Sequence, residues 1–137
     1  MKVQIRPFKA EDIPFIVSCW VKSSYKTGTG YMERPNIYHK GLDELIKKRY
    51  EEGSILAYVA CLEEDPDLIL GFAVFGTDYT LHFIYVKEAF KKQGISKSLL
   101  SFFYKTRKDI KVSFWTKDIK YIQKNYGLTY DRFRFFK

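Results

Sequence analysis

LHFIYVKEAFKKQGISKSLL, residues 81–100, is the most informative stretch of this chain. Its first six residues are apolar, aromatic or β-branched apart from one histidine, which is typical of a buried strand. A short basic segment follows, and after Gly94 the apolar residues Ile95, Leu99 and Leu100 recur at helical spacing. The stretch therefore predicts a strand over 81–86, a basic loop, a glycine, and a helix over about 94–107.

The start of the predicted helix is suited to an anion. The first turn of a helix leaves about four backbone N–H groups without intrahelical partners, and their partial positive charge favours a bound anion. Gly94 allows a ligand to approach the backbone because it has no Cβ, and Lys91, Lys92 and Lys97 add full positive charges. We expect a phosphate or pyrophosphate here. The alternative is an ordinary strand–helix turn with solvated lysines.

Positive charge is concentrated in the second part of the chain. Residues 1–86 contain 10 Lys/Arg and 12 Asp/Glu, a net charge of −2, whereas residues 87–137 contain 14 and 4, a net charge of +10. This distribution suits a multiply phosphorylated ligand. It also suits nucleic acid, because aromatic and basic residues interleave from Tyr121 to Lys137.

Length and composition limit the class of protein. The 137 residues fit a single domain over 1–137, and a hydrophobic content of 46% excludes a disordered chain. No run approaches the roughly 20 apolar residues that a membrane span needs, and the first residues lack the apolar region of a signal peptide. We therefore expect a cytoplasmic protein without a membrane segment. Cys19 and Cys61 lie in apolar patterns and are expected to be core residues, not a disulfide or a metal site.

Strands and helices alternate along the rest of the chain. The predicted strands are 3–6, 55–62, 68–75, 81–86, 111–115 and 128–136, and the predicted helices are 11–24, 42–52, 94–107 and 117–126. Gly127 is the expected C-cap of the last helix. Residues 26–41 lack sustained periodicity and predict a long loop, which would either cover the edge of the core or form a wall of a substrate pocket. The order predicts an α/β fold with one sheet and helices on both faces.

This order, with the basic loop at its centre, resembles the GNAT N-acetyltransferase superfamily over nearly the whole chain. IRPFKAEDIPFIVSCW looks like the first strand and helix of the family, YVKEAFKKQGISKSLL like its acetyl-CoA motif [RQ]-x-x-G-x-[GA], and YIQKNYGL like its late helix and following strand. Gly94 matches the motif, whereas Lys91 replaces the usual Arg or Gln and Ser96 the usual Gly or Ala. The resemblance implies a GNAT-like single domain with a mixed, mostly antiparallel central sheet.

The resemblance also implies acetyl-CoA as the acyl donor and no metal. Backbone amides from Gln93 to Lys97 would hold its pyrophosphate, and the pantetheine arm would pair with the end of the strand at 84–86, where a backbone N–H would meet the thioester carbonyl. The residues that the resemblance assigns to acetyl-CoA are Ile84, Tyr85, Val86, Lys91, Lys92, Gln93, Gly94, Ile95, Ser96 and Lys97.

The catalytic positions of the family are altered in this chain. Thr80 stands where several members have a carboxylate base and cannot serve as one. Asp78 and His82 would share its strand face by period-two alternation, so either could act as the base, although His82 could equally be a buried histidine with satisfied hydrogen bonds. Gln123 stands where a tyrosine usually protonates the thiolate, and Tyr126 is a nearby candidate.

We therefore expect an N-acetyltransferase that moves acetyl by direct transfer to a primary amine of a small molecule or a protein. Two alternatives remain open at this point. The altered positions Thr80 and Gln123 are compatible with a catalytically weak GNAT-like interaction module, and the basic second part of the chain is compatible with a nucleic-acid-binding protein. Exposed aromatic residues in the last predicted strand could pair two subunits as a homodimer.

Overall fold

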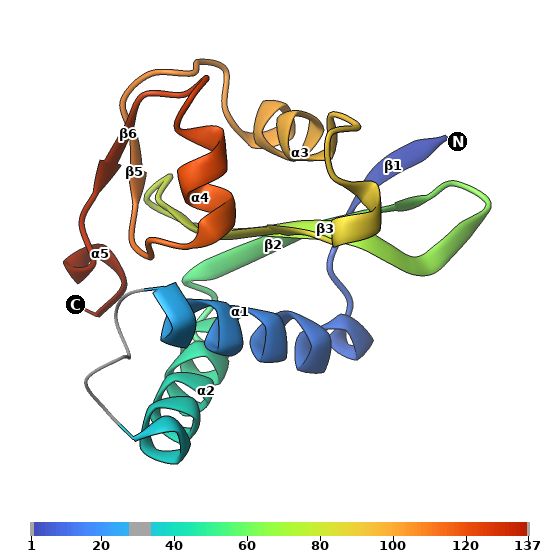
Figure 1. Cartoon of the computed structure of the whole chain (residues 1–137). Helices are drawn as coiled ribbons and strands as arrows, with labels where there is room; N and C mark the ends of the chain where they lie inside the picture. Colours follow the sequence, from blue (N-terminus) through green and yellow to red (C-terminus); the bar gives the residue numbers. More distant parts are fainter. Residues whose placement is uncertain (1, 28–33, 137) are drawn as a thin grey trace.

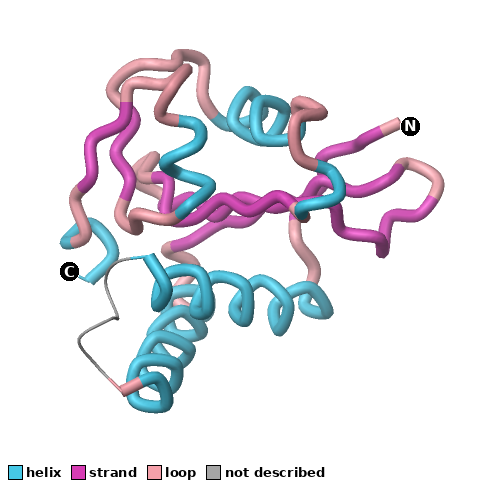
Figure 2. Tube along the Cα trace, viewed as in Figure 1, coloured by secondary structure: helices cyan, strands magenta, loops and turns pink. Residues whose placement is uncertain are grey.

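The computed structural model describes residues 2–27 and 34–136. They form a six-stranded sheet in the order β1-β2-β3-β4-β5-β6, with helices on both faces (Figures 1 and 2). The strands are β1 (Val3–Pro7), β2 (Ile55–Leu62), β3 (Asp65–Gly76), β4 (Leu81–Val86), β5 (Ile110–Val112) and β6 (Leu128–Tyr130). The helices are α1 (Ile13–Thr27), α2 (Pro35–Glu51), α3 (Ile95–Phe103), α4 (Lys117–Ile122) and α5 (Phe133–Phe136), with the short 3-10 helices η1 (Ala10–Asp12) and η2 (Glu88–Phe90). The predicted α/β class and the mixed sheet are confirmed.

The sheet has an antiparallel and a parallel part. Strands β1 to β4 pair antiparallel with their neighbours, whereas β4–β5 and β5–β6 are parallel. Strand β4 pairs with β5 at one position, Leu81 opposite Val112. Pairing stops there, so the backbone of β4 toward Val86 has no described strand beside it on that side.

Helices α1 and α2 cover one face of the sheet, and α3 and α4 cover the other (Figure 1). The centre of the first layer is Trp20, which is fully buried on α1. Its ring stacks on Phe83 at a centroid distance of 5.9 Å and meets the rings of Phe114 and Phe135 at 5.2 Å each. One aromatic side chain of α1 thus contacts β4, the segment after β5, and the last helix.

Helix α2 begins earlier than predicted. Helix α1 runs to Thr27 and the structure is helical again from Pro35, so the prediction of a loop over 26–41 is wrong for its first two and its last seven residues. Pro35 suits a first helical position, and Tyr38, Leu42 and Ile46 are buried one helical turn apart. The helical spacing was obscured by Gly41 and by the polar residues around it. Residues 28–33, part of the predicted substrate wall, lie outside the described residues.

The last predicted strand, 128–136, is also wrong in its second part. Strand β6 ends at Tyr130, where the Oδ1 of Asp131 accepts a hydrogen bond of 3.0 Å from the Phe133 N–H, and α5 follows. This turn directs Phe135 into the core. The edge strand through which subunits were expected to pair therefore has three residues.

Three further elements are shorter than predicted, although their order is correct. Helix α3 stops at Phe103, and α4 stops at Ile122. Gly127 is not the predicted C-cap, because its N–H donates to the Arg107 carbonyl oxygen at 2.6 Å and leads into β6. Strand β5 covers 110–112 and not 111–115, although the Ser113 N–H still donates to the Leu81 carbonyl oxygen at 3.2 Å.

No helix in the described part of the chain is long and apolar enough to cross a membrane. Within residues 2–27 and 34–136, no three His, Cys, Asp or Glu side chains gather closely enough to hold a metal ion. Cys61 is buried and Cys19 half-buried, and neither forms a disulfide.

Candidate functional site

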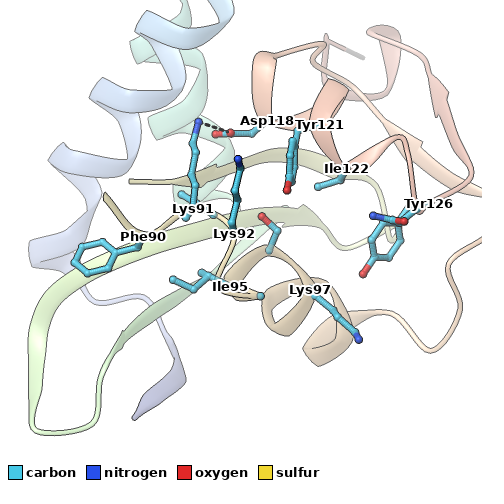
Figure 3. A pocket seen from close by; sticks show the side chains of 13 residues that line it. Phe90, Lys91, Lys92, Ile95, Lys97, Asp118, Tyr121, Ile122 and Tyr126 are labelled. Atoms are coloured by element: carbon cyan, nitrogen blue, oxygen red, sulfur yellow. Dashed lines mark ion pairs between the residues drawn. The ribbon is translucent and has the colours of Figure 1, made fainter. Parts of the chain in front are cut away.

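A cleft of about 290 Å³ lies between the loop that follows β4 and helix α4 (Figure 3). This volume is close to the lower end of the range for small-molecule sites, about 300–1,000 Å³. Residues from β4, the loop and α3 form one wall, and residues from α4 and the segment after it form the other. The lining residues are Val86, Phe90, Lys91, Lys92, Gly94, Ile95, Ser96, Lys97, Asp118, Tyr121, Ile122, Asn125 and Tyr126.

The loop opens the first turn of α3 toward this cleft. Lys92 and Gly94 both have left-handed backbone conformations, with φ of 65° and 78°. Such a conformation is uncommon for a residue with a side chain, whereas glycine adopts it readily. Gly94 is the N-cap of α3, and the N–H groups of 95–97 form the first turn without intrahelical partners. The loop therefore places backbone donors and three lysines at one end of the cleft.

Lys91 and Asp118 join the two walls of the cleft. The Lys91 Nζ lies 3.3 Å from Asp118 Oδ1 and 3.1 Å from Glu88 Oε2 (Figure 3 shows the first ion pair as a dashed line). The Val86 backbone N–H also favours the charged form of Asp118, which acts to lower the pKa of this carboxylate. A carboxylate from α4 thus lies in the cleft beside the free edge of β4.

Burial affects the two charges of this pair differently. Burial acts to lower the pKa of Lys91, but its hydrogen bond to Glu88 and the attraction of Asp118 are together stronger, so this pKa is raised. The Asp118 carboxylate is 16% exposed against 29% for the Lys91 side chain. Burial therefore dominates for Asp118 and raises its pKa, despite the nearby Lys91 and the Val86 N–H.

Tyr126 also lines the same cleft. Its oxygen is buried and has no hydrogen-bond partner among the described residues, while the Arg107 guanidinium lies 5.4 Å from the centre of its ring. An unpaired buried hydroxyl is costly, and a ligand in the cleft would supply a partner. The predicted acid Tyr126 therefore lies beside the predicted acetyl-CoA residues.

Most of the predicted acetyl-CoA residues meet in the cleft. Those that line it are Val86, Lys91, Lys92, Gly94, Ile95, Ser96 and Lys97. Ile84 is fully buried, the Tyr85 ring packs against Phe15 on the opposite face, and Gln93 is exposed outside the cleft.

The contribution of α4 to the cleft was not predicted. Its lining residues Asp118, Tyr121 and Ile122 follow a strand parallel to β4. A helix that follows a parallel neighbour returns across the same face as the helix after β4. This connection could have indicated that α4 lies beside α3. The sequence pattern did not show that β4 and β5 would separate and leave a cleft.

A second cavity, of about 190 Å³, lies at the other end of β4. Its lining residues are Arg49, Ser54, Ile55, Gly76, Thr77, Asp78, His82, Arg134 and Phe135. Two of the predicted catalytic residues, His82 and Asp78, are therefore together here, whereas Tyr126 is in the first cleft. The three do not form one constellation.

The predicted alternation of Asp78, Thr80 and His82 on one strand face is wrong. Strand β4 begins at Leu81, and Asp78 lies in the preceding turn. Asp78 and His82 nevertheless converge on Gly76, where a Cβ would lie 2.6 Å from Asp78 Oδ1 and 2.8 Å from His82 Nε2. Thr80 is fully buried, and its hydroxyl accepts a hydrogen bond of 2.7 Å from Arg134 Nε. The position of the usual base is thus occupied by a contact to α5.

His82 is held as a neutral imidazole. Its Nδ1 lies 2.5 Å from the hydroxyl of the fully buried Ser113, and its ring packs against Trp20 and Phe135. Burial lowers the pKa of His82 to about 4, which the Asp78 carboxylate only partly opposes. The Asp78 carboxylate is itself subject to burial, but hydrogen bonds from Thr80 and the charge of Arg134 lower its pKa.

The buried His82 predicts a loss of stability in acid. Since its pKa is about 4 in the folded state against 6.5 ordinarily, the unfolded chain binds a proton at this site between these pH values and the folded chain does not. Stability is complete above pH 6.5 and falls as the pH drops toward 4, by about 3 kcal/mol. Urea unfolding of wild type and His82→Gln between pH 7 and 4.5 measures this loss, which we expect to be much smaller in the variant. Parallel pH curves would contradict the assignment.

The sequence matches no protein-family model and no curated protein. Solved structures are similar in fold. A proposed acetyltransferase of Pyrococcus furiosus has a TM-score of 0.59 at 17% identity, over 95% of this chain and 82% of that chain. A predicted acetyltransferase of Clostridium acetobutylicum, solved with acetyl-CoA, has a TM-score of 0.58 at 11% identity, over 95% and 80%. A GCN5-related N-acetyltransferase of Rhodopseudomonas palustris has a TM-score of 0.51 at 16% identity, over 74% and 62%. The chain therefore has the fold of the GNAT N-acetyltransferases.

Proposed function

We propose that this protein is an acyl-CoA-dependent N-acyltransferase that moves acetyl from acetyl-CoA to a primary amine. The observation that carries the proposal is the cleft between the 91–97 loop and α4, at the point where β4 loses its neighbouring strand. Helix-terminal N–H groups, lysines, a strand edge and an unpaired tyrosine hydroxyl meet there. The acetyl-CoA-bound relative with the same fold supports this use of the cleft.

The residues of the cleft fit a diphosphate joined to an amide-bearing arm. The first turn of α3 and the side chains of Lys91, Lys92 and Lys97 would hold the diphosphate. Val86 lines the cleft where β4 has no neighbouring strand, and its N–H would bind a carbonyl of the arm. A Cβ added at Gly94 would meet nothing within 4 Å, so the backbone at this position is open to a ligand.

Transfer would proceed by attack of the neutral amine on the thioester. The thioester supplies a thiolate leaving group, for which Tyr126 is the proposed proton donor. His82 and Asp78 line the second cavity and not this cleft, so they are proposed to receive the proton of the amine through water. Because the pKa of His82 is about 4, it would be a weak base at neutral pH, and the reaction would depend on an amine that is already partly deprotonated.

A second candidate is a binding module that takes acyl-CoA without turning it over. Thr80, at the position of the usual base, is committed to Arg134. Gln123, at the position of the usual tyrosine, is exposed on the end of α4 and does not line the cleft. These two observations favour a weak catalyst over an efficient one.

Acetyl-CoA is expected to stabilise the folded protein. At a concentration about 100 times its Kd, a ligand that binds only the folded state adds roughly 2.7 kcal/mol, which for a domain of this size raises the Tm by on the order of 10 °C. Thermal unfolding with acetyl-CoA, and with ATP as a control polyphosphate, measures the shift. Equal shifts with both would contradict a specific site and favour a general polyanion surface such as one for nucleic acid.

Turnover separates the two candidates that share the cleft. Release of free coenzyme A in the presence of a panel of primary amines, over several turnovers, would establish the transferase. Stabilisation by acetyl-CoA without release across the panel would favour the binding module.

A further inference from the structure

Among the described residues that line the cleft, Asp118 is the one acidic residue. It lies where the proposed ligand would place negative charge. Its carboxylate is 3.3 Å from the Lys91 ammonium, it lines the cleft together with Val86, and the Val86 N–H favours its charged form. It extends from the first turn of α4, whose cap is Thr116. One carboxylate thus engages a group from each half of the site: the ammonium beside the α3 first turn and the amide at the edge of β4.

A ligand must replace both contacts to use the whole cleft. A diphosphate alone could attract Lys91, but the carboxylate would remain beside Val86, within reach of the phosphates and repelling them. A ligand that also carries an amide carbonyl could take the Val86 N–H and release the carboxylate from the strand edge. Asp118 therefore weakens the binding of a diphosphate alone more than the binding of a diphosphate that carries an amide-bearing arm.

We propose that Asp118 is a specificity-determining residue, which selects ligands that combine a diphosphate with an amide-bearing arm over nucleotides that have the diphosphate alone. This inference rests on the proposed function of the cleft. The carboxylate works by occupying Lys91 and Val86 until a ligand offers a replacement for each. A like-charge group of this kind discriminates through repulsion of the wrong ligand.

Asp118→Asn tests the selection with little change of shape. The amide oxygen can still lie beside Val86, but the negative charge is gone. We expect ADP binding to tighten by about tenfold, the size of one charge-assisted hydrogen bond, and acetyl-CoA binding to tighten by about threefold or less. The ratio of the two Kd values, measured by calorimetry at one salt concentration, should therefore fall in the variant.

Glu88→Gln is the matched control. Glu88 is the other carboxylate on Lys91, at 3.1 Å, but its side chain is 84% exposed and does not line the cleft. Glu88→Gln also removes one negative charge that pairs with Lys91. Because this is a surface pair, we expect the Kd values of ADP and acetyl-CoA to stay within about twofold of wild type. In a Lys91→Gln background, Asp118→Asn should tighten ADP binding less than it does in the wild-type background. The two residues form an ion pair, so their effects on ADP binding are coupled.

The outcomes separate this inference from the proposed function. If the wild-type protein binds acetyl-CoA, and Asp118→Asn prefers acetyl-CoA over ADP as strongly as wild type or more strongly, the inference alone is overturned. If the preference for acetyl-CoA over ADP falls by the same factor in Glu88→Gln, the inference is overturned as well. The effect would then come from net charge and not from the position of Asp118. Absence of acetyl-CoA binding by the folded wild-type protein would refute the proposed function.

Discussion

Gly94→Glu is expected to weaken acetyl-CoA binding by at least about 100-fold, which is roughly 2.7 kcal/mol. Gly94 lines the cleft as the N-cap of α3. A glutamate there places a negative charge beside the helix N–H groups that would hold the diphosphate and extends into the open space that they face. Calorimetric titration with acetyl-CoA measures the loss.

Two variants separate the causes of this loss. Gly94→Ala imposes the same left-handed backbone at φ 78° on a residue with a Cβ, at a stability cost of about 1 kcal/mol, but adds neither bulk nor charge. Gly94→Gln adds the bulk without the charge. We expect weakening of a few-fold for alanine, more for glutamine, and most for glutamate. If glutamate binds acetyl-CoA as tightly as alanine, the diphosphate does not lie at Gly94.

Trp20→Ala is expected to lower the free energy of unfolding by about 3–5 kcal/mol. The side chain is fully buried and contacts four aromatic rings from separate parts of the chain. Removing it leaves a cavity among rigid rings that cannot easily collapse. Because domains of this kind are stable by only about 5–15 kcal/mol, the variant should unfold at much lower urea concentration, which circular dichroism can follow.

Phe133→Ala is the control for Trp20→Ala. Phe133 lies on α5, two residues before the buried Phe135, but it is 58% exposed. Its removal should change the free energy of unfolding by less than about 1 kcal/mol. Comparable losses in the two variants would show that Trp20 is not the centre of this layer.

The central part of the fold could be predicted because local and tertiary signals agree there. The 81–86 strand is apolar on both faces, and the structure covers both faces with helices. Gly94 marked the start of α3 because the chain needs a left-handed residue at that position. Lys91, Lys92 and Lys97 line the cleft because they lie within a few residues of Gly94 in the sequence.

Other parts depend on contacts that no local pattern reports. The first turns of α2 are stabilised by Tyr38, whose hydroxyl donates to Ser24 on α1 at 2.8 Å. Helix α5 is stabilised because Phe135 packs against both Trp20 and Phe114. Both contacts join segments that are distant in the sequence.

The candidate site was predicted on one wall only. The basic loop is contiguous in the sequence and could be recognised as a unit. Asp118 reaches the same cleft from α4, through a contact with the backbone of Val86 that spans 32 residues of chain. A single acidic residue at the start of a short helix is common, so its position gave no indication of its partner.

The single pair of Leu81 and Val112 between β4 and β5 has a mechanical consequence. Most sheets resist bending across a strand boundary because several ladder hydrogen bonds would break together. Here the ladder between the antiparallel half and the β5–β6 half is reduced to one pair, while Trp20, packed on both Phe83 and Phe114, joins the two halves through the core. Beyond this pair, the gap beside β4 can widen without breaking the ladders on either side. Opening of the gap is therefore expected to cost less free energy than opening within either ladder.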